Sequence, residues 1–302
     1  LRFLSARPLV FEARGALGPR ECAALRDLAR RRADGAAAAG GKQAISLVAD
    51  AAAGSEAGGQ EEPEGRRALA RACCLVEEML ELPWHEGERD SPVVHFTPCP
   101  ARADADAGSV GPAAIAGHRR AGLGLGLHLD TNHRPMRCAT GILYLNTLPE
   151  SLGGATVFPC AENAPALAGE LDGLAREAAA AARLVAGPQE SELPCHGPFD
   201  LFSGPAMQHT GRASPEEEQQ DVHTERPHLR AAAAALLTAA EAGCGLSVQP
   251  EEGKLVVFFT RGPDGSVDPL SFHGGADVLS ADEDEHADPV AAVEGKWTMQ
   301  LF

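Results

Sequence analysis

A histidine and an aspartate two residues apart, His128 and Asp130, are the residues in this chain best suited to chemistry. On a strand or at its end, side chains at positions i and i+2 face the same side, so an imidazole and a carboxylate would converge on one point. The same pair in a loop would be a histidine beside a solvated aspartate. A second histidine from a distant strand would complete the two-histidine, one-carboxylate set that binds Fe(II) in non-haem oxygenases.

The third ligand has two candidates, His273 and His286. His273 follows the most strongly β-like run of the chain, whereas His286 lies in an acidic stretch typical of a solvent-exposed position. We favour His273 and keep His286 as the alternative. The other histidines fall in a predicted helical block or, like His95, lack a strand pattern that would bring them to the pair.

The elements that must position these residues can be predicted from the hydrophobic period. A period near 3.6 predicts helices at 19–34 and 65–82, joined by a loose loop at 35–64. Apolar runs bounded by turn residues predict strands at 93–96, 137–146, 156–158, 254–260, 270–273 and 296–302. Ala- and Glu-rich segments predict two further helices, at 166–186 and 215–242. We therefore expect a β domain interrupted by a helical insertion, because ordinary connections are far shorter than this block.

Composition sets the outer limits. The chain has 302 residues, of which 44% are hydrophobic, with a formal net charge of −17, which argues against nucleic-acid binding. No apolar run is long enough to span a membrane. The 8 cysteines are scattered without a CxxC pair, so they predict neither a zinc ribbon nor a disulfide scaffold, and they leave the compartment open. The chain begins with Leu1 rather than methionine, so we expect it to be a segment of a longer protein.

Several segments, in order, resemble the catalytic domain of the prolyl 4-hydroxylases, which are Fe(II)/2-oxoglutarate dioxygenases. The most specific are Gly-Gly-Ala-Thr-Val-Phe-Pro at 153–159 and Asp-Pro-Leu-Ser-Phe-His-Gly-Gly at 268–275. The others are 6–11 with the helix after it, His128-Leu129-Asp130, 137–146, 253–259, 263–265 and 295–297. The ordered combination is much more specific than any one segment.

The resemblance implies an α+β fold with a double-stranded β-helix (jelly-roll) core, flanking N-terminal helices and a helical insertion. It implies one catalytic domain over 1–302. Within it, 1–92 holds the N-terminal strand and supporting helices, 93–159 and 250–302 form the core, and 160–249 is the Ala/Glu-rich insertion. It also implies that His128, Asp130 and His273 are the catalytic residues and bind the iron.

The resemblance also implies which residues bind the co-substrate. Lys296 would pair with the distal carboxylate of 2-oxoglutarate, with Tyr144 as a second contact and Thr140 on the same strand face. Family members usually carry a tyrosine three residues before the first histidine, where this chain has Leu125. Arg137 is either a substrate-side or a structural residue.

The position of the lysine bears on the third ligand. Family members usually place it about ten residues after the distal histidine, and Lys296 lies ten residues after His286 (296 − 286 = 10). The local sequence 268–275 nevertheless favours His273, which implies an acidic insertion between His273 and Lys296. Such a loop lengthens at little entropic cost.

The implied reaction is hydroxylation of a C–H bond, with release of succinate and CO2. Its cofactor would be Fe(II), 2-oxoglutarate and O2 would be co-substrates, and ascorbate would assist. The resemblance favours a peptidyl proline in a proline-rich extended segment of a protein or peptide. It is compatible with a location in the endoplasmic reticulum or secretory pathway, but the localisation stays unknown. The alternatives are an oxygenase of the same superfamily acting on another side chain or a small molecule, and a non-enzymatic jelly-roll metal-binding module. The sequence does not indicate an oligomeric state.

Overall fold

A computed structural model describes residues 1–33, 43–48, 64–81, 91–99, 125–130, 137–162, 170–186, 235–236, 238–240, 242–279 and 294–302. Within these ranges, no helix is long and apolar enough to cross a membrane.

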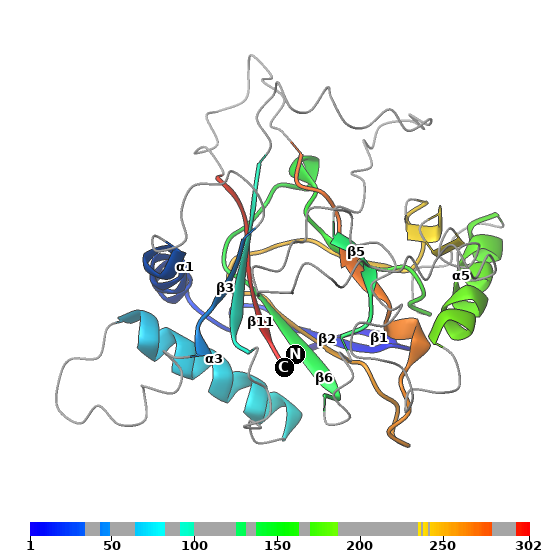
Figure 1. Ribbon diagram of the computed structural model, residues 1–302, viewed down its shortest axis with the longest axis horizontal. Coiled ribbons are helices and arrows are strands. Elements are labelled where there is room, and N and C mark those ends of the chain that lie inside the picture. Colours follow the sequence, from blue (N-terminus) through cyan, green and yellow to red (C-terminus); the bar gives the residue numbers. More distant parts are fainter. Residues whose placement is uncertain are drawn as a thin grey trace, which may run out of the picture.

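Two antiparallel sheets form the centre of the molecule (Figure 1). The larger has seven strands, in the order β1 (Arg2–Ala6), β2 (Leu9–Ala13), β9 (Leu255–Phe259), β6 (Ala139–Tyr144), β11 (Gly295–Leu301), β4 (Val93–Pro98) and β3 (Gln43–Ser46). The smaller has four, in the order β5 (Leu125–His128), β10 (His273–Gly275), β7 (Thr156–Phe158) and β8 (Leu246–Val248). Neighbours in the sheet are therefore often distant in sequence, as β6 and β11 are.

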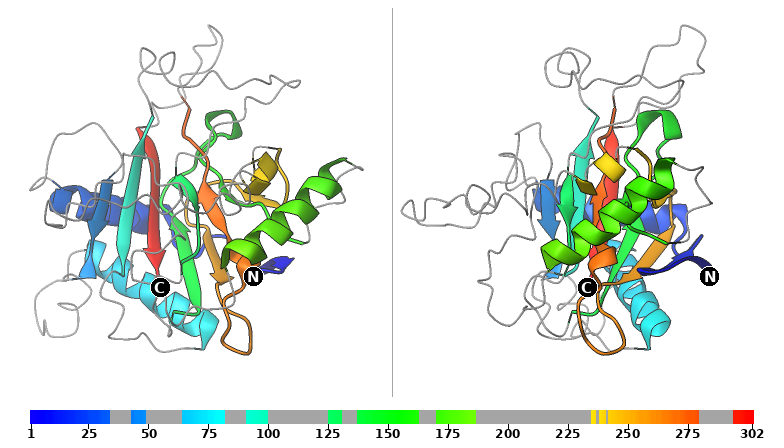
Figure 2. Two further views of the ribbon diagram at one scale, coloured as in Figure 1. Left: turned by 45° about the vertical axis from the view of Figure 1, so that its right-hand side comes forward. Right: turned by 90° about the vertical axis from the view of Figure 1, so that its right-hand side faces the viewer.

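Two helices, α1 (Pro19–Ala33) and α3 (Glu64–Leu80), cover the outward face of the larger sheet (Figure 2). Buried residues of α1 recur at helical spacing, and Leu25 packs in one core with Leu69 of α3. The same core includes Leu143 of β6 and Met299 of β11. The apolar stripe of each helix is thus the reason it lies on this sheet.

The opposite face of the larger sheet packs against the smaller sheet. Because side chains alternate along a strand, Ile142 and Tyr144 of β6 point inward while Leu143 points to the helices. Phe158 of β7 meets Phe258 of β9 edge-on, with ring centroids 5.0 Å apart. The two sheets therefore enclose an inward layer of side chains.

The smaller sheet has its own outer cover. Helix α5 (Glu170–Ala186) packs Ala178 and Ala182 against Leu127, Leu129 and the segment that leads into β10. A short 3-10 helix, η2 (Pro269–Ser271), lies against α5, and a second one, η1 (Glu150–Leu152), precedes β7. In Figure 2, α5 lies on the side of the molecule opposite α1.

Several sequence predictions agree with these elements. The helices predicted at 19–34 and 65–82 are α1 and α3, and the strand predicted at 156–158 is β7. The helix predicted at 166–186 is described from Glu170. Of the helix predicted at 215–242, the described residues 235–236 and 238–240 are helical, and the rest lies outside the described residues.

Two predictions are wrong. Of the strand predicted at 270–273, residues 270–272 are not in a strand, because Asp268 caps a turn that forms η2, and β10 begins only at His273. The loop predicted at 35–64 contains strand β3, whose Ala44 and Ile45 pair with β4. The sheets also include β1 and β2 from the N-terminal part and β8 from the predicted insertion. The fold is thus β-rich with antiparallel sheets and few helices, and the double-stranded β-helix stays a prediction.

Candidate metal centre

Three predicted ligands, His128, Asp130 and His273, converge on the inner side of the smaller sheet. His273 lies directly opposite His128 in the β10–β5 pairing. Asp130 Oδ1 is 3.3 Å from His128 Nε2, and Asp130 Oδ2 is 3.4 Å from His273 Nε2. One ligand atom from each residue lies within 4.8 Å of the others. No other group of three such side chains occurs among the described residues.

The alternation of β5 explains why the pair faces inward. Leu127 and Leu129 are fully or almost fully buried in the core beneath α5. The side chains between and after them, His128 and Asp130, must therefore point to the other face. Sequence reasoning predicted this arrangement from the His-x-Asp spacing.

The turn before β10 fixes the third side chain. Asp268 accepts a hydrogen bond from the Leu270 backbone N–H at 3.0 Å, and Pro269 presets the first turn of η2. Ser271 Oγ donates to the Asp268 carbonyl at 2.7 Å. This turn delivers His273 into the strand opposite His128.

The His273 ring is locked in one tautomer and one orientation. Its Nδ1 lies 3.1 Å from the Ser271 carbonyl oxygen, which can only accept, so Nδ1 carries the hydrogen and Nε2 keeps its lone pair. Phe258 and Phe158 enclose the ring, with centroids 4.5 and 5.4 Å away. A metal-binding histidine is normally held by such a hydrogen bond from its other nitrogen.

The electrostatics suit a cation. Burial alone would raise the pKa of Asp130, but the electrostatic effect of the neighbouring His273 and His128 outweighs it and holds that pKa well below its usual value. Asp130 Oδ2 and His273 Nε2 are buried without a hydrogen-bond partner among the described residues. Two buried lone-pair atoms aimed at one point are costly unless a cation binds there. The two imidazoles and one carboxylate are the donor set that Fe(II) accepts.

The predicted co-substrate residues line the inward face of the larger sheet. Lys296 is 7% exposed, and its Nζ lies 5.9 Å from the centre of the Tyr144 ring. The Tyr144 hydroxyl donates to Thr156 Oγ1 at 2.7 Å, and burial raises the pKa of the phenol. Thr140 faces the same way, and its buried hydroxyl has no hydrogen-bond partner among the described residues.

A glycine makes room for the lysine. Gly154 adopts a φ of +72°, and a Cβ there would lie 3.5 Å from Lys296 Cδ and 2.6 Å from Leu148 Cδ1. The Gly-Gly of the 153–159 motif therefore allows the chain to approach the lysine stem closely.

Two other predicted positions have different outcomes. Arg137 is buried, and its guanidinium lies 3.6 Å from the centre of the Phe302 ring. Leu125 begins β5, opposite Gly275 of β10. His286, the alternative ligand, lies outside the described residues.

Sequence reasoning found no strand partner for His95, whereas β4, which contains it, pairs with β11. His95 is not among the three converging ligands. His95 of β4 lies on the same face as Lys296 and Gln300 of β11, because it pairs with Thr298 between them. Its Nε2 is 2.9 Å from Gln300 Oε1. Burial lowers its pKa, and Asp130, His128 and Lys296 all act electrostatically on it. The alternating pattern Val94-His95-Phe96-Thr97 was the signal that could have identified it.

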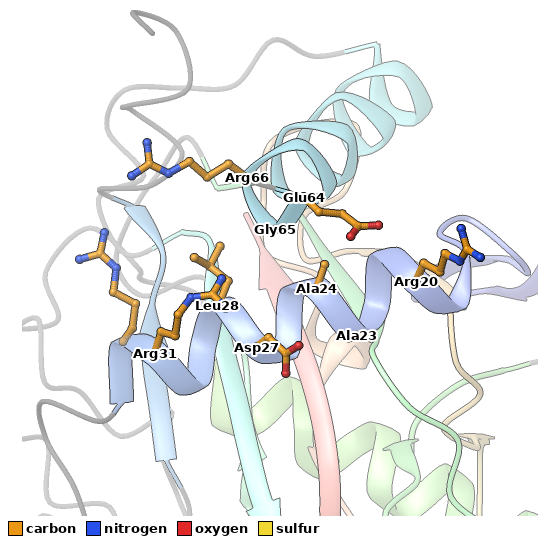
Figure 3. A pocket seen from close by; sticks show the side chains of 10 residues that line it. Arg20, Ala23, Ala24, Asp27, Leu28, Arg31, Glu64, Gly65 and Arg66 are labelled. Atoms are coloured by element: carbon orange, nitrogen blue, oxygen red, sulfur yellow. The ribbon is translucent and has the colours of Figure 1, made fainter. Parts of the chain in front are cut away.

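A hollow of about 990 Å³ lies elsewhere, between α1 and α3 (Figure 3). In Figure 3, Arg31 and Arg66 extend at one end, with Arg20 and Glu64 towards the other. These helices cover the outward face of the larger sheet, so the hollow is separated from the three converging ligands by that sheet. It takes no part in the candidate metal centre.

Comparison with known proteins gives structural neighbours only. No protein-family model and no curated protein matches the sequence. The viral collagen prolyl hydroxylase of Paramecium Bursaria Chlorella virus-1, in its 2OG complex, is 11% identical, with a TM-score of 0.38 and coverage of 96% of this chain and 92% of that chain. The non-heme iron oxygenase OrfP in complex with Fe is 16% identical, with a TM-score of 0.34 and coverage of 95% and 86%. TM-scores of this size support no functional assignment, which therefore depends on the residues themselves.

Proposed function

We propose that this protein is an Fe(II)- and 2-oxoglutarate-dependent dioxygenase that hydroxylates a C–H bond and releases succinate and CO2. The convergence of His128, Asp130 and His273 at one point is the observation that supports this most. The ordered sequence motifs support the same reading, with residues 1–302 as one catalytic domain built on a double-stranded β-helix.

In this proposal, His128, Asp130 and His273 bind Fe(II). The iron, when bound, supplies the oxygen-activating redox chemistry that no side chain can perform. The chain's own part is positioning. Asp130 supplies the negative charge, and the Ser271 carbonyl keeps His273 Nε2 free of a proton.

Lys296 would bind the distal carboxylate of 2-oxoglutarate. A buried carboxylate needs a cation, or its desolvation is not compensated. Lys296 is nearly buried on the same inward layer, and its Nζ lies 5.9 Å from the centre of the Tyr144 ring. The Tyr144 hydroxyl already has a partner in Thr156, so we assign Tyr144 to one wall of the co-substrate site.

The substrate we propose is a peptidyl proline in a proline-rich extended segment. Such a segment is already ordered as polyproline II and loses little entropy on binding. The second candidate is a different side chain or a small molecule. Ascorbate belongs in the assay as the reductant that the family resemblance implies.

Anaerobic addition of Fe(II) and then 2-oxoglutarate tests the centre. We expect a visible charge-transfer band that is lost in His128→Ala and His273→Ala and retained in His286→Ala. A band that survives in both of the first two variants, or is lost only in His286→Ala, would contradict the assignment. Succinate release under O2, with proline-rich peptides against small-molecule panels, then separates the two substrate classes.

A further inference from the structure

We propose that His95, held by Gln300, binds the substrate of the oxygenase through a neutral hydrogen-bond donor, an N–H or O–H group. The inference rests on the proposed function and adds a substrate-binding residue to it. Its basis is a polar pair on the inward face that neither the metal ligands nor the co-substrate residues require.

His95 and Gln300 lie on the inward layer of the larger sheet. His95 pairs with Thr298 across β4 and β11, so its side chain lies on the inward layer beside Lys296 and Gln300. It is outside the group of converging ligand atoms, which contains only His128, Asp130 and His273 among the described residues. Asp130 and His128 nevertheless influence its pKa, and its side chain lies on the inward layer without belonging to their group.

The pairing of β4 with β11 does not require a hydrogen bond between the side chains of His95 and Gln300. β4 and β11 are already paired from Gly295 to Gln300, and Val94 and Met299 fill the core behind them. Setting a polar histidine and glutamine into this layer costs desolvation, which an apolar pair of similar volume would avoid. A binding role accounts for that cost.

The geometry also indicates what His95 binds. Gln300 Oε1 is an acceptor 2.9 Å from His95 Nε2, so Nε2 carries the hydrogen. Burial favours the neutral ring, whose Nδ1 then presents only a lone pair. A lone pair accepts from an N–H or O–H and repels a carboxylate. The residue is half-buried, and in this proposal the ligand approaches from its exposed side.

Two variants of His95 separate binding from a structural role. In His95→Asn, the amide oxygen replaces the acceptor near Nδ1 but does not reach Gln300. In His95→Gln, the longer amide replaces the link to Gln300 but loses the acceptor. We expect the asparagine variant to retain most substrate-stimulated succinate release and the glutamine variant to lose about tenfold, the usual effect of one hydrogen bond to a substrate. The opposite order, or equal effects, would overturn the inference.

The probes are (Pro-Pro-Gly)10 and free L-arginine, each added to the protein with Fe(II), 2-oxoglutarate and O2. The probe that stimulates wild-type succinate release identifies whether a peptide or a small molecule supplies the donor. Arg71→Ala, an exposed change on α3, is the matched control, and we expect wild-type rates from it. If neither probe stimulates succinate release, the inference that His95 binds an N–H or O–H group of such a substrate is overturned.

The anaerobic charge-transfer band distinguishes this inference from the proposed function. If wild-type protein gives no band, the proposed function fails. If wild-type protein gives the band but a His95 variant does not, His95 acts on the metal centre and the inference fails alone. We expect both variants to give the band, with the difference confined to substrate stimulation.

Discussion

Replacing Lys296 by methionine should separate co-substrate binding from metal binding. Methionine keeps an unbranched chain of similar volume and removes the cation. Lys296 is 7% exposed, so little water can replace its charge beside a bound carboxylate. Removing one partner of such a buried pair costs about 3–5 kcal/mol. Since about 1.4 kcal/mol is tenfold in affinity, the Kd for 2-oxoglutarate should rise roughly 100- to 4,000-fold.

The assay is anaerobic titration of 2-oxoglutarate into the Fe(II)-loaded variant, followed by the charge-transfer band or by calorimetry. Lys254→Met is the matched control, because Lys254 is equally buried, but its Nζ already donates to the Gln249 carbonyl at 2.9 Å and pairs with Glu251 at 3.1 Å. We expect that control to lose stability and keep its 2-oxoglutarate affinity. A Lys296→Met protein that binds Fe(II) and whose Kd rises less than about threefold would refute the reasoning.

Three further outcomes are expected from the same structure. Gly154→Ala should lower the free energy of unfolding, measured by urea titration, by about 1–3 kcal/mol, because its positive φ and a leucine methyl 2.6 Å from the new Cβ both oppose a side chain. Gly265→Ala should lower it less, because Gly265 has a similar φ of +79° but open space around it. In native protein, iodoacetamide should modify exposed Cys74 well before Cys160, since burial raises the pKa of the Cys160 thiol to about 12, and peptide mapping that finds equal labelling would contradict this burial. In metal-free protein, the lowered pKa of Asp130 means that its carboxylate stabilises the fold at pH values above 3.8, the pKa of this group in the unfolded chain. This stabilisation is lost as the pH falls below 3.8. Asp130→Asn should therefore show a smaller fall in urea midpoint than the wild type between about pH 5 and pH 3.

Local patterns predicted the features that depend on local physics. The apolar stripe on α1 and the alternation of apolar and polar residues around His128 each predict which face is buried, and the structure buries those faces. The capped turn at Asp268 was hidden in the sequence because Leu270 and Phe272 are as apolar as a strand, although they pack beneath α5 from a turn. Apolar content alone cannot separate these two cases.

Pairing between distant segments was much harder to predict. Strand β3 is only four residues long, within a segment rich in Gly and Ala, and it exists because β4 offers an edge on which Ala44 and Ile45 pair. His95 was missed for a related reason. Its inward position depends on β11 lying beside β4, a contact between residues about 200 apart in sequence.

The candidate centre shows why a motif identified one part of the site and missed another. The metal ligands must present fixed donor types at fixed spacing, so His-x-Asp and the distal histidine leave a trace in the sequence. A substrate contact needs only one suitable atom on the correct face, and many residue types at many positions supply one. His95 and Gln300 satisfy that weaker requirement through the pairing of β4 with β11, and no spacing along the chain encodes it. Substrate specificity in this fold is therefore to be sought in which polar groups the larger sheet turns towards the metal ligands.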